Sequence, residues 1–366
     1  MKLVKFHSEE HKQKQFAKEL RHNVNAYFKE NNLSTKGNAI MWLKTLSAYT
    51  LYVAPFVIIL LYNTSFLQSF LLYVLIGIGT AGVGMSVMHD ALHNSYSKHK
   101  WVNKIMGYSL YIIGSNVFNW KIQHNIFHHA YTNIGGLDED IKPRWIMRFS
   151  EQSPLKPIHK YQYLYSFPLY TMMTISMLLG DLPKLIGYNK AGLVKQHLGD
   201  PKKEFSILIG VKLIYLFIFI GLPIIYTDLA WWQVLISFIA MHMMAGFIFA
   251  LVFQLAHIVE GVAQPVPNED KVTENEWAVH QLMTTANFAP GNKLLNWYVG
   301  GLNFQVEHHL FPNICHLHYP AISKIVEATA KKYDIPYLQN PTLWSALVSH
   351  IKRLKELGKV PIPVTN

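Results

Sequence analysis

Cysteine is nearly absent from this 366-residue chain, which contains Cys315 alone. A single cysteine cannot form an intramolecular disulfide, and it cannot supply the thiolate ligands of a zinc or iron–sulfur site. Charged residues are also scarce, at 15% of the chain, whereas an ordinary soluble domain has about 25%. The low charge argues against a soluble protein. Any reactive site must be built from His, Asp, Glu, Asn and Gln.

Motifs that read nucleic acid are missing too, although the formal net charge is +11. The basic residues are not interleaved with a zinc finger, a helix-turn-helix or a similar motif, so no nucleic-acid partner is expected. Residues 1–44 carry nine Lys or Arg and four Glu without an apolar core segment. This composition excludes a signal peptide.

Long apolar runs are abundant in a chain that is 51% hydrophobic. Four runs come close to the ~20 residues that a bilayer requires, and they cover about 43–62, 66–88, 207–227 and 230–254. Short turns join the first to the second and the third to the fourth. The sequence therefore predicts an all-α integral membrane protein with four transmembrane helices arranged as two hairpins. Two more apolar segments, 105–118 and 163–180, are shorter or more broken and are predicted to be re-entrant or interfacial helices.

The basic residues predict the orientation in the membrane. The turns at 63–65 and 228–229 contain no Lys or Arg, and the bases lie in 1–42, 89–206 and 255–366, apart from Lys44 and Lys212 near the inner ends of their helices. Cytoplasmic loops carry the excess of Lys and Arg in membrane proteins. Both termini are therefore expected in the cytosol.

This topology divides the chain into three predicted parts. Residues 1–42 form a cytosolic amphipathic region lying on the membrane surface, in which Phe6, Phe16, Leu20, Val24 and Phe28 follow a helical period; a partly disordered tail is the alternative. Residues 43–260 form the membrane domain, with cytosolic and interfacial helices between 89 and 206. Residues 261–366 form a cytosolic cap, with amphipathic helices over 319–358 and an extended tail at 360–363.

Three clusters of histidine follow apolar runs on the side predicted to be cytosolic. Residues four apart on an α-helix share a face, and the next residue lies about 100° further round. The imidazoles of His124, His128 and His129 can therefore converge on one point. Neutral imidazole binds iron, zinc, copper and nickel well and magnesium or calcium poorly; a histidine-rich surface loop is the alternative. The other clusters are His89 with His93, and His308 with His309, and His257 at the foot of the fourth run adds an eighth imidazole.

Eight imidazoles exceed the about four to six ligands of one ion, so two metal ions are predicted at a shared site. A matching set of Glu ligands is missing, which separates the chain from the carboxylate-bridged helical bundles. His257, taken alone, is as consistent with a structural role as with metal binding.

The order H-x-x-x-H, H-x-x-x-H-H and Q-x-x-H-H resembles the membrane fatty acid desaturase family over about residues 40–335, including His-His-Leu-Phe-Pro at 308–312. Gln305, at the head of the third box, is similar to the front-end or acyl-lipid branch. The resemblance implies a four-span fold whose helical cytosolic cap holds a non-haem di-iron centre (Fe2+/Fe3+). It also implies that O2 and two electrons introduce a double bond into an acyl chain.

By the same resemblance, the iron ligands are His89, His93, His124, His128, His129, His308 and His309, and His257 resembles the further ligand after the fourth span. Gln305 stands where related members have a His, so it is a possible ligand, a holder of water or a neighbour of the ligands. No catalytic residue separate from the metal ligands is predicted, and no organic cofactor.

Side chains beside the boxes are candidates for orienting the imidazoles, and each is equally open to a solvated or packing role. The candidates are Asp90, Asn133, His280 and Glu307, with Asp138, Asp140, Glu276, Trp120 and Gln281 as further ones. His242, inside the fourth run, is an ionisable residue within the membrane, and we predict a neutral, hydrogen-bonded packing role for it.

Partners follow from the resemblance. The chain has no His-Pro-Gly-Gly haem motif, so no fused cytochrome b5 domain is expected, and electrons come from a separate ferredoxin, or from cytochrome b5 with its reductase. A basic cytosolic face suits an acidic carrier; alternatively, the bases serve topology and anionic lipid. The substrate is a fatty acyl chain linked to coenzyme A, a carrier protein or a membrane lipid, and the expected location is a bacterial inner membrane.

Three other functions share parts of this pattern. A di-iron membrane hydroxylase of acyl chains, sterols or carotenoids would use the same ligands. A zinc-dependent membrane hydrolase would act without O2. A metal transporter would place His and Asp at mid-membrane depth, whereas these clusters lie outside the apolar runs.

Overall fold

The computed structural model describes residues 4–8, 10–142 and 146–360. The chain forms two compact units. We call Asn38–Ile122 with Phe167–Leu251 the span unit, and Met1–Gly37, Gln123–Ser166 and Val252–Asn366 the histidine unit. The predicted extended tail, apart from Val360, lies outside the described residues.

Among the residues that the structure describes, four helices are long and apolar enough to cross a membrane: Ala39–Leu61 (α2), Phe66–Leu92, Pro201–Tyr226 and Trp231–His257 (α13). The second joins α3 (Phe66–Gly82), the π-helix η1 (Val83–Met88) and α4 (His89–Leu92), and the third joins α11 (Pro201–Leu216), the π-helix η4 (Phe217–Gly221) and α12 (Leu222–Tyr226). Many of their large apolar side chains are exposed, as expected for surfaces that meet lipid. The predicted four-span, all-helical membrane fold is confirmed.

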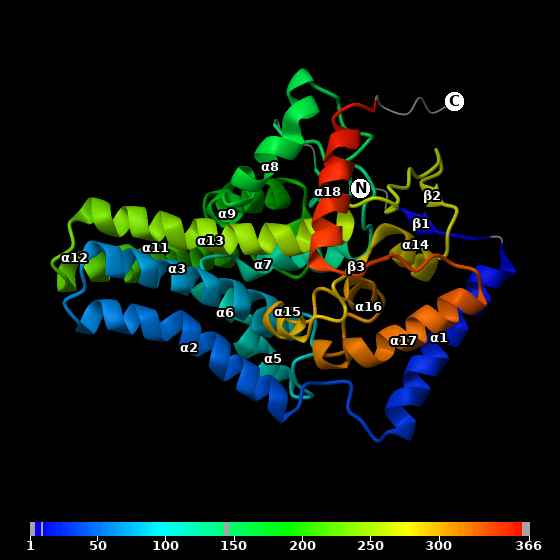
Figure 1. Cartoon of the computed structure of the whole chain (residues 1–366), viewed down its shortest axis with the longest axis horizontal. Helices are drawn as coiled ribbons and strands as arrows, with labels where there is room; N and C mark the ends of the chain where they lie inside the picture. Colours follow the sequence, from blue (N-terminus) through cyan, green and yellow to red (C-terminus); the bar gives the residue numbers. More distant parts are fainter. Residues whose placement is uncertain (1–3, 9, 143–145, 361–366) are drawn as a thin grey trace. The chain divides into compact units, whose positions relative to one another are not determined.

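The first hairpin is defined by its helix caps. The side chain of Asn38 accepts from the Ile40 amide at 2.9 Å and starts α2. Ser65 and Gln68 form a reciprocal capping box that starts α3. α2 and α3 then lie side by side (Figure 1). A Cβ added at Gly79 would meet the backbone of Tyr52 at 2.6 Å, so a small residue here lets the two helices approach closely.

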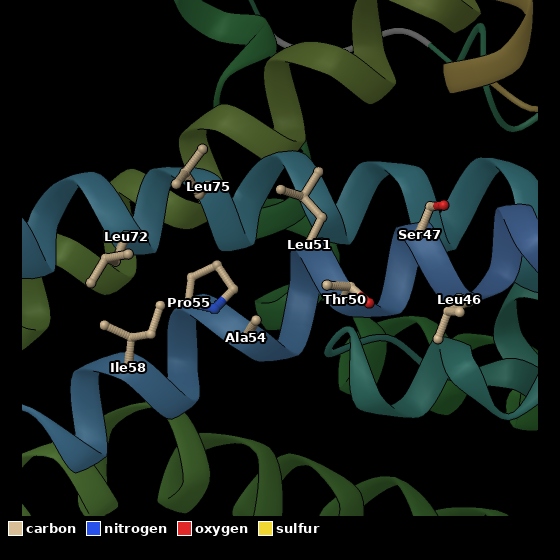
Figure 2. Close-up of a pocket in the computed structure, with 9 residues that line it drawn as sticks. All are labelled: Leu46, Ser47, Thr50, Leu51, Ala54, Pro55, Ile58, Leu72 and Leu75. Atoms are coloured by element: carbon tan, nitrogen blue, oxygen red, sulfur yellow. The ribbon is translucent and has the colours of Figure 1, made fainter.

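An open apolar groove of about 660 Å³ runs along these two helices. Figure 2 shows it around Pro55, inside α2, which lacks a backbone N–H for the helical ladder. Its other lining residues are Leu46, Ser47, Thr50, Leu51, Ala54, Ile58, Leu72 and Leu75.

The two additional apolar segments form broken helices, and neither is among the four candidate spans. The first gives α5 (Lys100–Gly107), α6 (Ser109–Ile112) and α7 (Val117–Trp120). The second gives α8 (Gln162–Tyr170) and α9 (Met173–Lys190), which α10 (Leu193–Gln196) follows. Gly114, with φ 89°, is one of the breaks, because this backbone conformation favours glycine.

Several polar side chains inside the span unit contact one another. Lys212 of α11 lies 2.6 Å from Asp181 of α9, and Asn119 of α7 donates to the Asp181 carbonyl at 2.8 Å. His242 of α13 contacts the Tyr215 hydroxyl at 3.0 Å and the Thr174 hydroxyl at 3.1 Å. These contacts agree with the packing role predicted for His242.

The described part of the histidine unit contains helices and two pairs of very short parallel strands. Its helices are α1 (His11–Glu30), α14 (Trp277–Thr284), α15 (Lys293–Tyr298), α16 (Gln305–Leu310), α17 (Tyr319–Lys332) and α18 (Leu343–Leu357), with 3-10 turns η3 (Pro157–Tyr161) and η5 (His316–His318). β1 (Lys5–Phe6) pairs with β2 (Val272–Thr273), and β3 (Asn287–Phe288) pairs with β4 (Gln339–Asn340).

The apolar face of α1 packs against protein. Phe16, Leu20, Val24 and Phe28 join one core with residues of α14, α16 and α17, and α1 lies beside α17 (Figure 1). Other helices therefore cover the apolar face of α1, while the position of residues 1–42 on the membrane surface stays a prediction. Phe6 does not belong to the helix: it lies in β1, with its ring 4.9 Å from that of His280.

Candidate metal centre

Three buried imidazoles from distant parts of the chain meet in the histidine unit. His128, His257 and His309 each offer a ring nitrogen within 4.8 Å of the others. Their ring centroids are 4.8 Å apart for His128–His257 and His128–His309, and 5.0 Å apart for His257–His309. His128 ends the helix Lys121–His128, His257 ends α13, and His309 lies in α16. The three residues are therefore far apart in the sequence but close together in space.

A second group of imidazoles lies beside the first. His129 and His308 have centroids 4.5 Å apart, and His124 and His308 lie 6.0 Å apart. The Nε2 atoms of His124 and His129 approach to 3.1 Å. All three side chains are buried, so six of the eight predicted histidines form one cluster in this unit.

The local helix type brings the second box together. Residues Lys121–His128 form a π-helix, η2, and the His129 amide donates to the His124 carbonyl at 3.0 Å, five residues earlier. This wider turn corrects the α-helical geometry that places His129 about 100° from the shared face. π-turns of this kind occur often at functional sites.

Carboxylates orient His128. Its Nδ1 lies 3.2 Å from both oxygens of Asp138 and 3.3 Å from Asp140. Burial lowers the pKa of His128, but the two carboxylates outweigh burial and raise it. Burial opposes ionisation of Asp138, yet His128 and the amides of Asn133 and Asp140 hold the pKa of Asp138 below its ordinary value. A carboxylate on Nδ1 leaves Nε2 as the nitrogen available to a metal.

Neutral groups contact the Nδ1 atoms of His308 and His309. The Nδ1 of His309 lies 2.9 Å from Gln281 Oε1 and 3.1 Å from the Thr132 hydroxyl. The Nδ1 of His308 lies 3.2 Å from the Tyr319 hydroxyl. Gln281 also donates to the His129 carbonyl at 3.1 Å, so one side chain contacts two of the histidine boxes.

Asn133 and His280 tie backbone segments together around the cluster. Asn133, with φ 58°, donates to the carbonyls of His257 at 3.1 Å and Thr284 at 3.2 Å. His280 Nε2 lies 2.9 Å from the Thr132 carbonyl, and burial lowers the pKa of His280 to about 4. A neutral His280 can therefore donate this hydrogen bond.

Glu307 is buried and contacts groups other than imidazole. It accepts hydrogen bonds from Asn287 at 2.8 Å and from the Tyr337 hydroxyl at 2.9 Å. Burial raises the pKa of Glu307 to about 7. These bonds hold α16, which carries His308 and His309, against β3 and the chain before β4.

His89, Asp90, His93 and Gln305 are also buried, whereas Glu276 is half-buried. In the span unit, His89 and His93 have ring centroids 4.8 Å apart, and each lies 5.8 Å from the Trp120 ring. Asp90 lies between them in α4, and its carbonyl accepts from Ser95. Gln305 starts α16, is 1% exposed, and has a side-chain nitrogen with no hydrogen-bond partner among the described residues.

The donor set fits a transition metal. The Nε2 atoms of His128 and His257 are buried without a hydrogen-bond partner among the described residues. Leaving a buried polar atom unsatisfied costs about 1–3 kcal/mol, and metal binding removes that cost. Imidazole donors favour iron, zinc or copper over magnesium or calcium.

Thr132, Thr284 and Tyr319 contact the histidines but are not among the residues predicted from the sequence. Thr132 follows His128 by four residues and its hydroxyl donates to the His128 carbonyl at 2.7 Å, so helical spacing could have indicated it. Tyr319 and Thr284 carry no such signal, because only tertiary packing brings them to the imidazoles.

Comparison with known proteins gives a consistent result. A sequence profile described as "Fatty acid desaturase" matches residues 64–341. The chain is 36% identical to the "Acyl-lipid (8-3)-desaturase" of Physcomitrium patens, over 92% of this chain and 70% of that protein. It is 34% identical to the "sn-1 linoleoyl-lipid 6-desaturase" of Synechocystis sp., over 94% of this chain and 96% of that protein. The protein of the same description from Arthrospira platensis is 32% identical, with 94% and 93% covered.

Proposed function

Because the chain belongs to the fatty acid desaturase family, we propose that it inserts a double bond into the acyl chain of a membrane lipid at a pair of irons. The protein is an enzyme, a fatty acid desaturase, with four membrane-spanning helices. The observation that carries the proposal is the cluster of His128, His257 and His309, whose Nδ1 atoms are occupied by protein groups.

The reaction requires a redox metal. The substrate loses two hydrogens, and these, with two protons and two electrons, reduce O2 to two molecules of water. An unactivated methylene has no acidic hydrogen and no leaving group, so no side chain can attack it as an acid, a base or a nucleophile. Iron supplies the oxidising power when bound, while the protein holds the ligands and excludes water.

Eight imidazoles form the proposed ligand set: His89, His93, His124, His128, His129, His257, His308 and His309. Six of them belong to the buried cluster of the histidine unit, and the assignment of His89 and His93 rests on the sequence. For Gln305 we propose a position at the metal site, supported by its burial and by its unpartnered amide nitrogen. Whether it binds metal directly is tested by the metal content of Gln305→Ala.

The side chains behind the ligands have distinct proposed roles. Asp138 fixes the tautomer of His128, and Gln281 does the same for His309. Asn133 and His280 hold backbone, and Glu307 holds α16. Asp90 lies between His89 and His93 in the sequence, and we propose on this basis that it orients their imidazoles.

The proposal also covers the substrate and the electron donor. The relatives are named for acyl-lipid and linoleoyl-lipid substrates, which supports a lipid-linked substrate over coenzyme A or a carrier protein. A separate one-electron carrier, a ferredoxin or cytochrome b5, supplies the electrons.

The excess of Lys and Arg in the segments that connect the hairpins supports cytosolic termini, and we propose a bacterial inner membrane as the location. The division into 1–42, 43–260 and 261–366 stays a proposal as well.

Expression in a host that lacks polyunsaturated lipids tests the function directly. The lipids should gain an acyl species lighter by two hydrogens, and a His128→Ala variant should lose this product. A species heavier by one oxygen would instead indicate the hydroxylase, and product formation without O2 would contradict the mechanism. Supplying the substrate as phospholipid or as acyl-coenzyme A distinguishes the two carrier forms.

A further inference from the structure

Four basic residues form a stripe along the exposed side of α1. Lys14, Lys18, Arg21 and Lys29 are exposed, and with Asn25 they follow one another at intervals of three or four residues, which places them on one face of a helix. None of the four forms an ion pair with another described residue. We call these four residues the α1 stripe.

Acidic residues of α1 lie away from this stripe. Glu19 accepts hydrogen bonds from Lys332 at 2.7 Å and from the Tyr333 hydroxyl at 2.7 Å, both near the end of α17. At about 100° per residue, Glu30 points roughly 100° or more away from the Lys14–Lys18–Arg21 side. The α1 stripe is therefore a run of positive charge without a carboxylate inside it.

An aromatic route leads from this helix to the histidine cluster. Phe28 lies one residue before Lys29 and is buried, with its ring centroid 5.0 Å from that of His318. Tyr319 follows His318 in the chain, and its hydroxyl lies 3.2 Å from His308 Nδ1. All these residues belong to the histidine unit. Electron tunnelling weakens steeply with distance, so closely packed rings favour transfer along such a route.

We infer that the α1 stripe docks an acidic one-electron carrier, whose electrons reach the metal centre through Phe28, His318 and Tyr319. The inference rests on the proposed function, because only a redox centre needs this supply. Each docking event oxidises one carrier and delivers one electron, and two such events serve each double bond. Complementary charge steers such encounters and raises their rate.

Two features favour a carrier protein over an anionic membrane as the occupant. A helix that lies on a bilayer buries its apolar face in the lipid, whereas the apolar face of α1 is covered by α14, α16 and α17. The route from Phe28 also ends on a predicted metal ligand, and lipid binding gives no reason for such a path.

Charge reversal tests the docking surface. The variant K14E/K18E/R21E/K29E is assayed in lipid nanodiscs with reduced plant-type ferredoxin, and with the soluble cytochrome b5 domain, as donors. Its KM for the donor should rise by at least about tenfold at low salt, and the difference should shrink in about 1 M salt, where the Debye length is about 3 Å. The matched control K190E/K195E/K202E/K203E reverses four other exposed lysines and should leave the KM unchanged.

Chemical reduction separates this inference from the proposed function. The stripe variant and its lysine control are reduced anaerobically with dithionite and then given O2. Both should form as much single-turnover product as the wild type. If the wild type forms product and the stripe variant has an unchanged KM for the donor, the docking surface alone is overturned. Absence of product in the wild type under every reductant would overturn the function. The stripe variant could instead lose product equally with dithionite as the reductant, and only in anionic nanodiscs. That result would show that the stripe binds lipid and would reject the inference.

A second variant tests the route. Phe28→Leu should leave the donor KM unchanged but slow the reduction of the metal centre by ferredoxin several-fold in stopped-flow measurements. Phe16→Leu, an equally buried change on α1 whose ring contacts Tyr333, is the control and should reduce at the wild-type rate. Equal reduction rates in the two variants, at equal thermal stability, would reject the route.

Discussion

Asp138 is the side chain on which the orientation of His128 depends. It is fully buried, and its two oxygens also accept the amides of Asn133 and Asp140. The carboxylate is therefore held in place before it contacts the imidazole. In metal sites, loss of such a partner typically costs 10–100-fold, by order of magnitude, in metal affinity or activity.

We expect Asp138→Asn to lose activity by about 10–100-fold, together with part of the bound metal. The amide introduced at position 138 can donate an N–H to His128 Nδ1, which favours the imidazole tautomer with its proton on Nε2. The substitution also removes the negative charge of the carboxylate. Iron per chain, measured by mass spectrometry, and desaturated product report the two effects. Asp334→Asn, at an almost fully exposed carboxylate, is the control. Unchanged iron and activity in Asp138→Asn would contradict the orienting role.

His350 predicts a pH dependence of stability. It is buried on α18, with Nδ1 2.6 Å from the Ile258 carbonyl, and burial lowers the pKa of His350 to about 4. In the unfolded chain the pKa is about 6.5. Between these values the unfolded state binds a proton that the folded state does not, so the contribution is complete above pH 6.5 and is lost as the pH falls towards 4.

The expected loss between pH 7.5 and pH 5 is about 2 kcal/mol of unfolding free energy, since one pKa unit corresponds to about 1.4 kcal/mol. His350→Gln keeps a donor for Ile258 but cannot be protonated, so its stability should fall less over the same range. His22→Gln, at an exposed position, should behave as the wild type. Denaturation of the three proteins at both pH values measures the difference, and parallel losses would exclude His350 as the titrating group.

At the level of helices, the ion pair between Lys212 and Asp181 connects α11 to α9. The side chains are 13% and 6% exposed, and Lys212 also donates to the Gly114 carbonyl at 2.7 Å. Removing one partner of a buried pair leaves an uncompensated charge, which costs about 3–5 kcal/mol, whereas replacing both partners by apolar residues is often neutral.

Asp181→Leu and Lys212→Met should each lower the unfolding free energy by about 3 kcal/mol, and the double variant should lose less than either single variant. Thermal unfolding of the four proteins in the same detergent completes the cycle. Losses that simply add would show that the two side chains act independently.

For the whole molecule, metal binding should stabilise the fold. The imidazoles of the histidine unit come from η2, α13 and α16, so an ion bound by them links segments that chain connectivity leaves separate. A ligand that binds only the folded state raises stability in proportion to the logarithm of its concentration over its Kd. The metal-free protein should therefore unfold at a lower temperature.

Removal of metal by a chelator should abolish desaturation and lower the Tm, and hydrogen exchange at α16 and η2 should become faster. Reconstitution with zinc should restore the Tm without activity, because zinc binds imidazole but has no redox chemistry. Iron should restore both. Desaturation by the zinc form would contradict a redox role for the metal.

Orientation in the membrane is a second property of the whole molecule. We expect reporter fusions at the N-terminus and at the C-terminus to be active in the cytosol, because four spans return the chain to its starting side and the bases lie in the segments between hairpins. A fusion at 228–229 should report the opposite side. A C-terminal fusion active outside the cytosol would contradict the topology.

The four spans could be predicted because membrane insertion depends on local composition. Four apolar runs, their short turns and the distribution of bases are properties of contiguous sequence, and a bilayer acts on each run separately. The order and spacing of the histidine boxes are likewise local properties of the sequence, and they indicate the desaturase family.

Tertiary structure alone decided how the histidines are arranged and held. The π-turn of η2 depends on which backbone hydrogen bonds the packed chain favours, so the α-helical spacing placed His129 wrongly. The contacts of Gln281, Tyr319 and Thr132 with the boxes, and the burial of the apolar face of α1 by α17, join segments far apart in the sequence. Composition and periodicity describe which faces are apolar or polar, but the partner of each face depends on packing across the whole chain.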